Sequence, residues 1–174
     1  EGRGKKFQVY LETLNTAKGT YQISEKIPLI SSDKIENLNE NKSQISDSNL
    51  KLGKFVGRNI LDINNPVIIL AAKINETYTI ADYLYENCNQ DFKVDEDIEL
   101  LKKFIQTEVG EDFPLIKYLD KRIATHSSAI PDEIRQLIEM LMVEGKLQVL
   151  VSTTTIAQGI NFPVSAVIMG SYTY

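Results

Sequence analysis

From residue 66 onward, short runs of consecutive apolar residues alternate with longer stretches in which apolar residues recur every three or four positions. A continuous apolar run is typical of a strand buried on both faces of a parallel sheet, whereas the wider spacing is typical of a helix with one buried face. The pattern predicts four strands, at residues 67–72, 123–125, 147–152 and 166–170. It therefore indicates an α/β fold in which strands and helices alternate.

Helices are predicted between the strands because the connections carry apolar stripes at helical spacing. In chain order, the stripes comprise Ile80, Ala81, Leu84 and Cys88, then Ile98, Leu101 and Ile105, and finally Ile134, Leu137, Ile138 and Leu141. A short helix is expected at residues 115–119. Pro131 is expected in the first turn of the last helix, where its missing N–H costs nothing, and Gly145 is expected to cap its end. Right-handed crossovers then imply a doubly wound, mostly parallel sheet with helices on both faces.

The first fifty residues have a different pattern. Residues 7–14 and 19–27 are rich in β-formers about a turn apart, so they are predicted to pair as a hairpin or else to belong to a neighbouring domain. Between residues 31 and 49 almost every position is polar, so this stretch is expected to be a partly flexible linker. A helical stripe follows at 52–60. The expected organisation is a linker or tail at 1–50 and one folded domain at 51–174.

Composition narrows the classes of protein. The chain has 174 residues, of which 43% are hydrophobic, and this suits one packed core. The net charge of −5 excludes nucleic-acid binding through a basic field over the whole surface, so any such contact must be local. Cys88, the single cysteine, is expected in the core and excludes a disulfide framework. No apolar run is long enough for a membrane span and no signal peptide is recognised, so an intracellular, cytoplasmic protein is expected.

Candidate chemistry lies where the predicted strands end. In open parallel sheets, ligands bind beyond the carboxyl ends of the strands, which here precede residues 73–77, 126–128 and 153–161. The third segment contains three threonines, and Gly159 permits a close approach of the backbone to a ligand. Hydroxyl groups and backbone amides bind phosphate without net positive charge. Taken alone, a threonine run at a strand end is more typical of simple β-propensity.

The segment VLVSTTTIAQGINFP resembles motif V of the superfamily-two helicases, and especially of their DExH branch, at nearly every position. Upstream, THSSAIPDEIRQLIEMLMVEGKLQVLVS is similar to the segment that precedes this motif, and VIILAAKINETYTIADYL occupies the place of motif IV. The resemblance covers roughly residues 52–174. It implies the second RecA-like domain of such a helicase, ending before motif VI.

The resemblance assigns roles to residues of motif V. Thr153 and Thr155 would contact the nucleic-acid backbone, while Gly159 and Asn161 would reach the ATP bound between two RecA-like domains. Asn161 stands where DEAD-box proteins have Asp, which favours the DExH branch.

Four further residues are carried over as nucleic-acid contacts. Lys73 and Thr77 follow the motif IV strand, although the family usually has Ser or Thr followed by Arg there, whereas here Lys73 precedes Ile74. His126 is either such a contact or a capped or core histidine before Pro131. Arg135 is either such a contact or the partner of Glu139 at i, i+4.

The resemblance also implies ATP as cofactor, with Mg²⁺ held mainly by the first RecA-like domain of the same parent chain. No Gly-x4-Gly-Lys-Ser/Thr loop occurs, and the acidic segment at 94–100 is predicted to begin a helix rather than to form a DExx box. No catalytic residue is therefore assigned, and the fragment alone is expected to be inactive. The expected partners are single-stranded or duplex nucleic acid and the first motor domain, with no membrane. A duplex translocase and an inactive RecA-like protein-interaction module are the alternatives.

Overall fold

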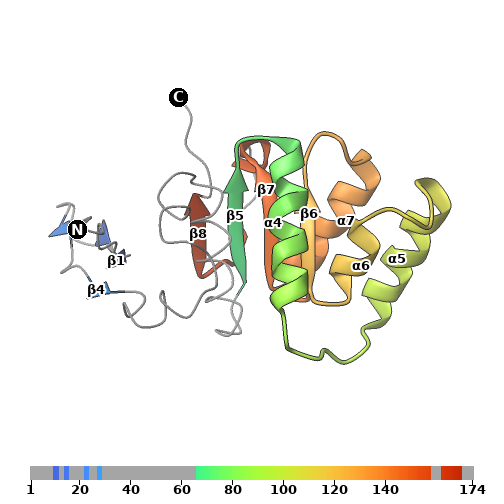
Figure 1. Cartoon of the computed structure of the whole chain (residues 1–174), viewed down its shortest axis with the longest axis horizontal. Coiled ribbons are helices and arrows are strands. Elements are labelled where there is room, and N and C mark those ends of the chain that lie inside the picture. Colours follow the sequence, from blue (N-terminus) through green and yellow to red (C-terminus); the bar gives the residue numbers. More distant parts are fainter. Residues whose placement is uncertain are drawn as a thin grey trace, which may run out of the picture. The chain divides into compact units, whose positions relative to one another are not determined.

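The computed structural model describes residues 66–157 and 162–169, together with four two-residue strands near the amino terminus (Figure 1). The chain divides into two compact units, Glu1–Asp47 and Ser48–Tyr174. In the first unit, β1 (Tyr10–Leu11) pairs antiparallel with β4 (Ile27–Pro28), and β2 (Leu14–Asn15) pairs antiparallel with β3 (Gln22–Ile23). The predicted pairing of these two segments is confirmed. The predicted linker at 31–49 and helix at 52–60 lie outside the described residues.

The second unit contains a four-stranded parallel sheet. Its strands are β5 (Val67–Ala71), β6 (Ile123–His126), β7 (Val149–Thr153) and β8 (Ala166–Met169), in the spatial order β6-β7-β5-β8. All four predicted strands are confirmed, with ends displaced by one or two residues. The two central strands, β5 and β7, are buried along nearly their whole length, which is why they read as continuous apolar runs.

Helices fill the connections as predicted. They are α4 (Ile74–Asn87), α5 (Glu96–Glu108), α6 (Leu115–Leu119) and α7 (Asp132–Val143), and a short 3₁₀ helix, η1 (Thr154–Ala157), follows β7. The acidic segment does begin a helix. Asp95 is the N-cap of α5, and its side chain accepts hydrogen bonds from the backbone N–H groups of Asp97 and Ile98.

The helices cover both faces of the sheet. On one face, Val67, Ile69 and Val151 pack against α4 through Ile80, Ala81 and Leu84, and Cys88 is buried at the end of that helix as expected. On the other face, Ile68, Ala124 and Leu150 pack against α7. Helix α5 packs on α7 and α6, at the side of the sheet where β6 lies (Figure 1). Each fully buried isoleucine or leucine in these layers contributes about 1.5–3 kcal/mol.

Two details of α7 correct the sequence-based prediction. Pro131 is not inside the first turn but is the N-cap residue, with φ −52° and ψ 145°, and the helix begins at Asp132. Met142, absent from the predicted stripe, is fully buried, whereas Leu137 is half-buried at the border facing α5.

Gly145 ends α7 as predicted, because it adopts a positive φ of 71°. The Gly145 and Lys146 N–H groups donate to the Met142 and Leu141 carbonyls respectively, which is the Schellman arrangement.

The amino-terminal edge of the sheet is held together by Arg122. This residue adopts a left-handed backbone with φ 57° just before β6. Its guanidinium donates to the carbonyl groups of Lys93 at 2.8 Å and Lys146 at 3.3 Å, and lies 3.5 Å from the Asp95 carboxylate. Arg122 thereby joins the loop between α4 and α5 to the segment before β7.

Candidate nucleic-acid and nucleotide interface at the sheet edge

Three strands deliver their last residues to one edge of the sheet. The register places Ala71 of β5 beside Thr153 of β7, and His126 of β6 beside Ser152 of β7. The residues that follow these strands are therefore neighbours at the carboxyl edge, as parallel topology requires. Of the predicted site residues, Lys73, His126 and Thr153 are brought to this edge.

The end of β5 leads directly into α4. Lys73 is the N-cap residue of α4 and is exposed, and its neighbour Ala72 donates its N–H to the Glu76 carboxylate at 3.1 Å. Thr77 is placed differently from Lys73, because it is fully buried and its hydroxyl donates to the Ile74 carbonyl at 2.6 Å. In this position the Thr77 hydroxyl stabilises the first turn of α4 and does not face solvent.

The end of β6 carries a buried histidine. The His126 side chain is 4% exposed, and its Nε2 lies 2.7 Å from a carboxylate oxygen of Glu139 on α7. Its Nδ1 lies 3.5 Å from the Ser152 hydroxyl on β7. This environment matches the core-histidine alternative. Sequence reasoning missed both partners, because they lie 13 and 26 positions away along the chain.

Arg135 lies one turn into α7 and is partly exposed. It pairs with Asp132, three positions earlier, and Glu139 is engaged by His126. The proposed pairing of Arg135 with Glu139 is therefore wrong. The charge of Arg135 is satisfied near the start of the helix, where acidic residues also suit the positive end of the dipole.

The end of β7 begins the threonine-rich segment. Thr153 is the last strand residue and is 8% exposed, while Thr154 opens η1 and is exposed. Ser152 is fully buried and donates its hydroxyl to the Thr153 carbonyl at 2.8 Å. Thr155 lies in η1, and nothing is described of its side chain. Gly159 and Asn161 lie outside the described residues.

Burial raises the pKa of Tyr78 on α4, and the Thr125 hydroxyl on β6 partly offsets this rise. Within residues 66–157 and 162–169, no cluster of three or more His, Cys, Asp or Glu side chains is arranged to hold a metal ion. Among the described residues of this edge, the groups suited to bind phosphate are hydroxyl groups, backbone amides and the exposed Lys73.

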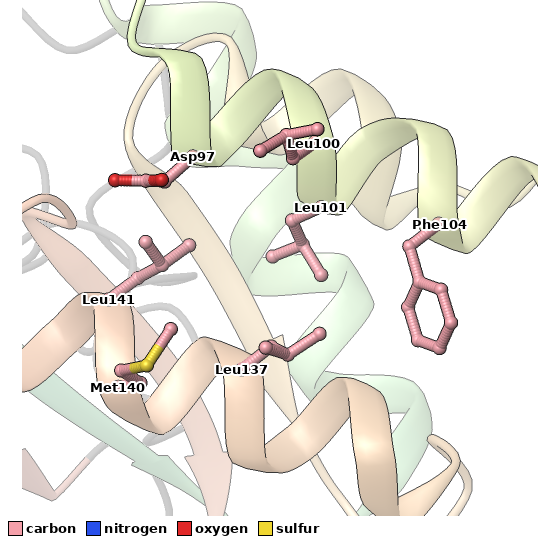
Figure 2. Close-up of a pocket in the computed structure, with 7 residues that line it drawn as sticks. All are labelled: Asp97, Leu100, Leu101, Phe104, Leu137, Met140 and Leu141. Carbon is pink, nitrogen blue, oxygen red and sulfur yellow. The ribbon is translucent and has the colours of Figure 1, made fainter.

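A separate hollow of about 240 Å³ lies between α5 and α7. Figure 2 shows Leu100, Leu101 and Phe104 of α5 opposite Leu137 and Met140 of α7. Its lining is almost entirely apolar, so it offers no phosphate-binding groups. Among the described residues, no helix is long and apolar enough to cross a membrane.

Taken together, the parallel sheet and the helices on both of its faces define a doubly wound α/β domain with a RecA-like fold. A solved structure supports the fold. The DUF1998 helicase MrfA, bound to DNA and AMPPNP, aligns with 76% of this chain and 15% of its own chain, with a TM-score of 0.51 and 16% identity.

Parts of the chain are also similar in sequence to known proteins. The Hachiman protein HamB of Bacillus cereus is 41% identical over 64 residues, which is 37% of this chain and 6% of HamB. The ATP-dependent DNA helicase Hel308 of Pyrobaculum calidifontis is 34% identical over 74 residues, or 42% of this chain and 10% of Hel308. The DExH-box ATP-dependent RNA helicase DExH10 of Arabidopsis thaliana is 31% identical over 88 residues, or 45% of this chain and 9% of DExH10.

Hel308 and DExH10 are both ATP-dependent helicases, which agrees with the helicase resemblance of the motif V segment. It spans a tenth or less of the length of each of these curated relatives. No family model matches the sequence.

Proposed function

We propose that the chain is the second motor domain of an ATP-dependent nucleic-acid helicase. The observation that carries the proposal is the threonine-rich segment that leaves β7 at the carboxyl edge, beside the ends of β5 and β6. Parallel α/β sheets bind their ligands at this edge. The helicase relatives named above supply the class of activity.

The proposed nucleic-acid contact is made by Thr153 and Thr155 with the sugar–phosphate backbone. Hydroxyl groups bind phosphate oxygens without a basic surface, which suits a chain of net charge −5. Lys73 lies exposed after the neighbouring strand and adds one local positive charge. Thr77 is left out of this contact, because its buried hydroxyl is already donated within α4. Because the proposed contact does not involve the edges of the bases, little sequence specificity is expected.

The proposed nucleotide contact is made by Gly159 and Asn161, which follow the threonines along the chain. ATP would lie between this domain and the first motor domain, where its phosphates and Mg²⁺ would be held mainly by that other domain. An asparagine amide is suited to hydrogen bonds with ribose hydroxyls. Hydrolysis is accordingly expected from the two domains together and not from this chain alone.

The test compares alanine variants at neighbouring threonines in the full-length protein. Thr153→Ala together with Thr155→Ala should weaken binding to single-stranded nucleic acid roughly 5- to 150-fold, because each lost hydrogen bond contributes about 0.5–1.5 kcal/mol. Stimulation of ATP hydrolysis by the strand should fall in parallel. Thr154→Ala, which changes an exposed threonine of the same segment, is the matched control and should retain binding.

Two results would contradict the assignment. Unchanged binding and stimulation in the double variant, with an unchanged melting temperature, would remove the proposed contact. A loss in Thr154→Ala as large as in the double variant would show that the wrong hydroxyls had been chosen.

A further inference from the structure

A line of three polar side chains, of which His126 and Ser152 are buried, joins α7 to the threonine-rich segment. Glu139 on α7 contacts Nε2 of His126 at 2.7 Å, and Nδ1 of His126 lies 3.5 Å from the Ser152 hydroxyl. The Ser152 hydroxyl in turn donates to the Thr153 carbonyl at 2.8 Å. We call these side chains the Glu139–His126–Ser152 relay. It crosses from a helix through the edge strand β6 to β7.

The donor and acceptor roles in the relay follow from Glu139. An ionised carboxylate only accepts hydrogen bonds, so the short contact requires a hydrogen on Nε2 of His126. In the neutral ring, Nδ1 then carries a lone pair and is an acceptor. Glu139 therefore favours the Nε2–H tautomer of His126. In that tautomer, Nδ1 can only accept a hydrogen bond from Ser152.

Ser152 has one hydroxyl hydrogen and two acceptors within reach. The Thr153 carbonyl, at 2.8 Å, holds the hydrogen in this structure, whereas Nδ1 of His126 lies at 3.5 Å, the longer and weaker contact. If the hydroxyl turned to Nδ1, the Thr153 carbonyl would lose this donor. If Nδ1 carried the ring hydrogen instead, it would no longer accept from Ser152.

The acid–histidine–serine order resembles that of serine hydrolases, but burial excludes that chemistry. Ser152 is 0% exposed, so no substrate can reach its oxygen. His126 is nearly as buried, and Glu139, with 23% of its side chain exposed, is the member nearest solvent. The relay is thus suited to holding the backbone in place.

We propose that Glu139 and His126 are positioning residues for the nucleic-acid contact: the Nε2–H tautomer that Glu139 favours makes Nδ1 a second acceptor for the Ser152 hydroxyl, in competition with the Thr153 carbonyl where the threonine-rich segment begins. This inference rests on the proposed function only for its consequence. The hydrogen-bond relay itself is a property of the described structure. A displacement of α7 that moves Glu139 therefore changes the hydrogen bonding of the Thr153 carbonyl.

The test uses the single histidine of the chain. In the 174-residue chain without a histidine tag, ¹⁵N signals of the imidazole distinguish a protonated ring nitrogen from an unprotonated one. The wild type should show the Nε2–H tautomer. Glu139→Gln should populate both tautomers, because a glutamine amide presents either an acceptor or a donor to Nε2. The backbone signals of Thr153 and Thr154 should shift in the same variant.

The order of action is tested by Ser152→Ala. This variant should shift the Thr153 and Thr154 signals and leave the histidine in its Nε2–H form, because Glu139 is intact. Thr125→Val is the matched control. Thr125 is the neighbour of His126 in β6, and its hydroxyl is also fully buried. The Thr125 side chain lies near Tyr78 of α4, so its replacement should change none of these signals.

An Nδ1–H tautomer in the wild type would overturn the proposal, and so would a folded Glu139→Gln chain with unchanged Thr153 and Thr154 signals. In the full-length protein, Glu139→Gln and Ser152→Ala should each lower strand-stimulated kcat several-fold at unchanged KM for ATP, and the double variant should be no worse than Ser152→Ala. If these variants keep full stimulation while Thr153→Ala with Thr155→Ala loses it, the relay has no positioning role. If all of them keep full stimulation, the proposed function itself is wrong.

Discussion

Among the surface carboxylates of α5, Asp95 is the one whose removal should lower the free energy of unfolding most. Its carboxylate accepts from the N–H groups of Asp97 at 3.1 Å and Ile98 at 3.3 Å, and lies 3.5 Å from the Arg122 guanidinium. Loss of an N-cap typically costs about 1 kcal/mol, and a partly exposed ion pair contributes up to about 1 kcal/mol. Asp95→Ala should therefore lower the free energy of unfolding by about 1–2 kcal/mol. In a domain of this size that corresponds to a fall in Tm of roughly 2–8 °C.

The same site predicts a pH dependence. Burial raises the pKa of the Asp95 carboxyl, but hydrogen bonds from the Ile98 and Asp97 amides and the charges of Arg122 and Lys146 outweigh it, so the pKa lies below its usual value. A carboxyl with a lowered pKa in the folded state stabilises the fold above its unfolded pKa of about 3.9, and this stabilisation is lost as the pH falls through the folded pKa. Asp95→Asn, which keeps a good capping group, should lie closest to wild type at low pH.

Thermal melting followed by circular dichroism at pH 7 and at steps down to pH 3 measures both effects. Asp120→Ala is the control, because Asp120 forms a surface ion pair with Lys102 and caps no helix through its side chain. It should change Tm by less than Asp95→Ala does. Equal losses in the two variants, or a gap between wild type and Asp95→Asn that widens as the pH falls, would refute the capping argument.

Three further predictions test the structure. Thr77→Val should leave nucleic-acid affinity unchanged in a binding titration and cost about 0.5–1.5 kcal/mol in a denaturant melt, because the lost hydroxyl bonds only within α4; weaker binding at unchanged stability would restore Thr77 to the contact. Ile138→Ala should cost about 2–5 kcal/mol in the same melt, because Ile138 is fully buried, whereas half-exposed Met140→Ala should cost clearly less; equal costs would place α7 in the wrong rotation. Gly145→Ala should cost about 1 kcal/mol through its left-handed backbone alone, since a Cβ there meets no atom within 4 Å, and Gly145→Asn should recover part of it.

The order of strands and helices was predictable because it depends on local apolar patterns. Strands β5 and β7 are buried on both faces, so their sequences are continuous apolar runs. Helical stripes such as Ile98, Leu101 and Ile105 are buried on one face of their helix. Leu137 was harder to place. It lies where α5 covers α7, and the docking of one helix on another leaves no periodic signature in either sequence.

Which polar side chains pair with one another at the sheet edge was not predictable from their spacing along the chain. Helical spacing suggested Arg135 with Glu139, but Asp132 takes the arginine and His126, on another element, takes the glutamate. Such choices depend on which side chains the completed fold brings within about 3 Å, and several partners satisfy the local pattern equally well. The threonine-rich segment was recognisable because its residue types follow one another along the chain.

The loop between α4 and α5 is bound by Arg122, so it is a suitable place to attach a label that follows the motion of the domain. Val94 is 84% exposed, and its neighbours Lys93 and Asp95 are tied to Arg122, so a dye attached at this position would move with the domain and not independently of it. In Figure 1 this loop, between α4 and α5, lies at the end of the domain opposite to the arrowheads of β5 and β8. A fluorophore at residue 94 would therefore report rigid-body rotation by energy transfer without covering the carboxyl edge of the sheet.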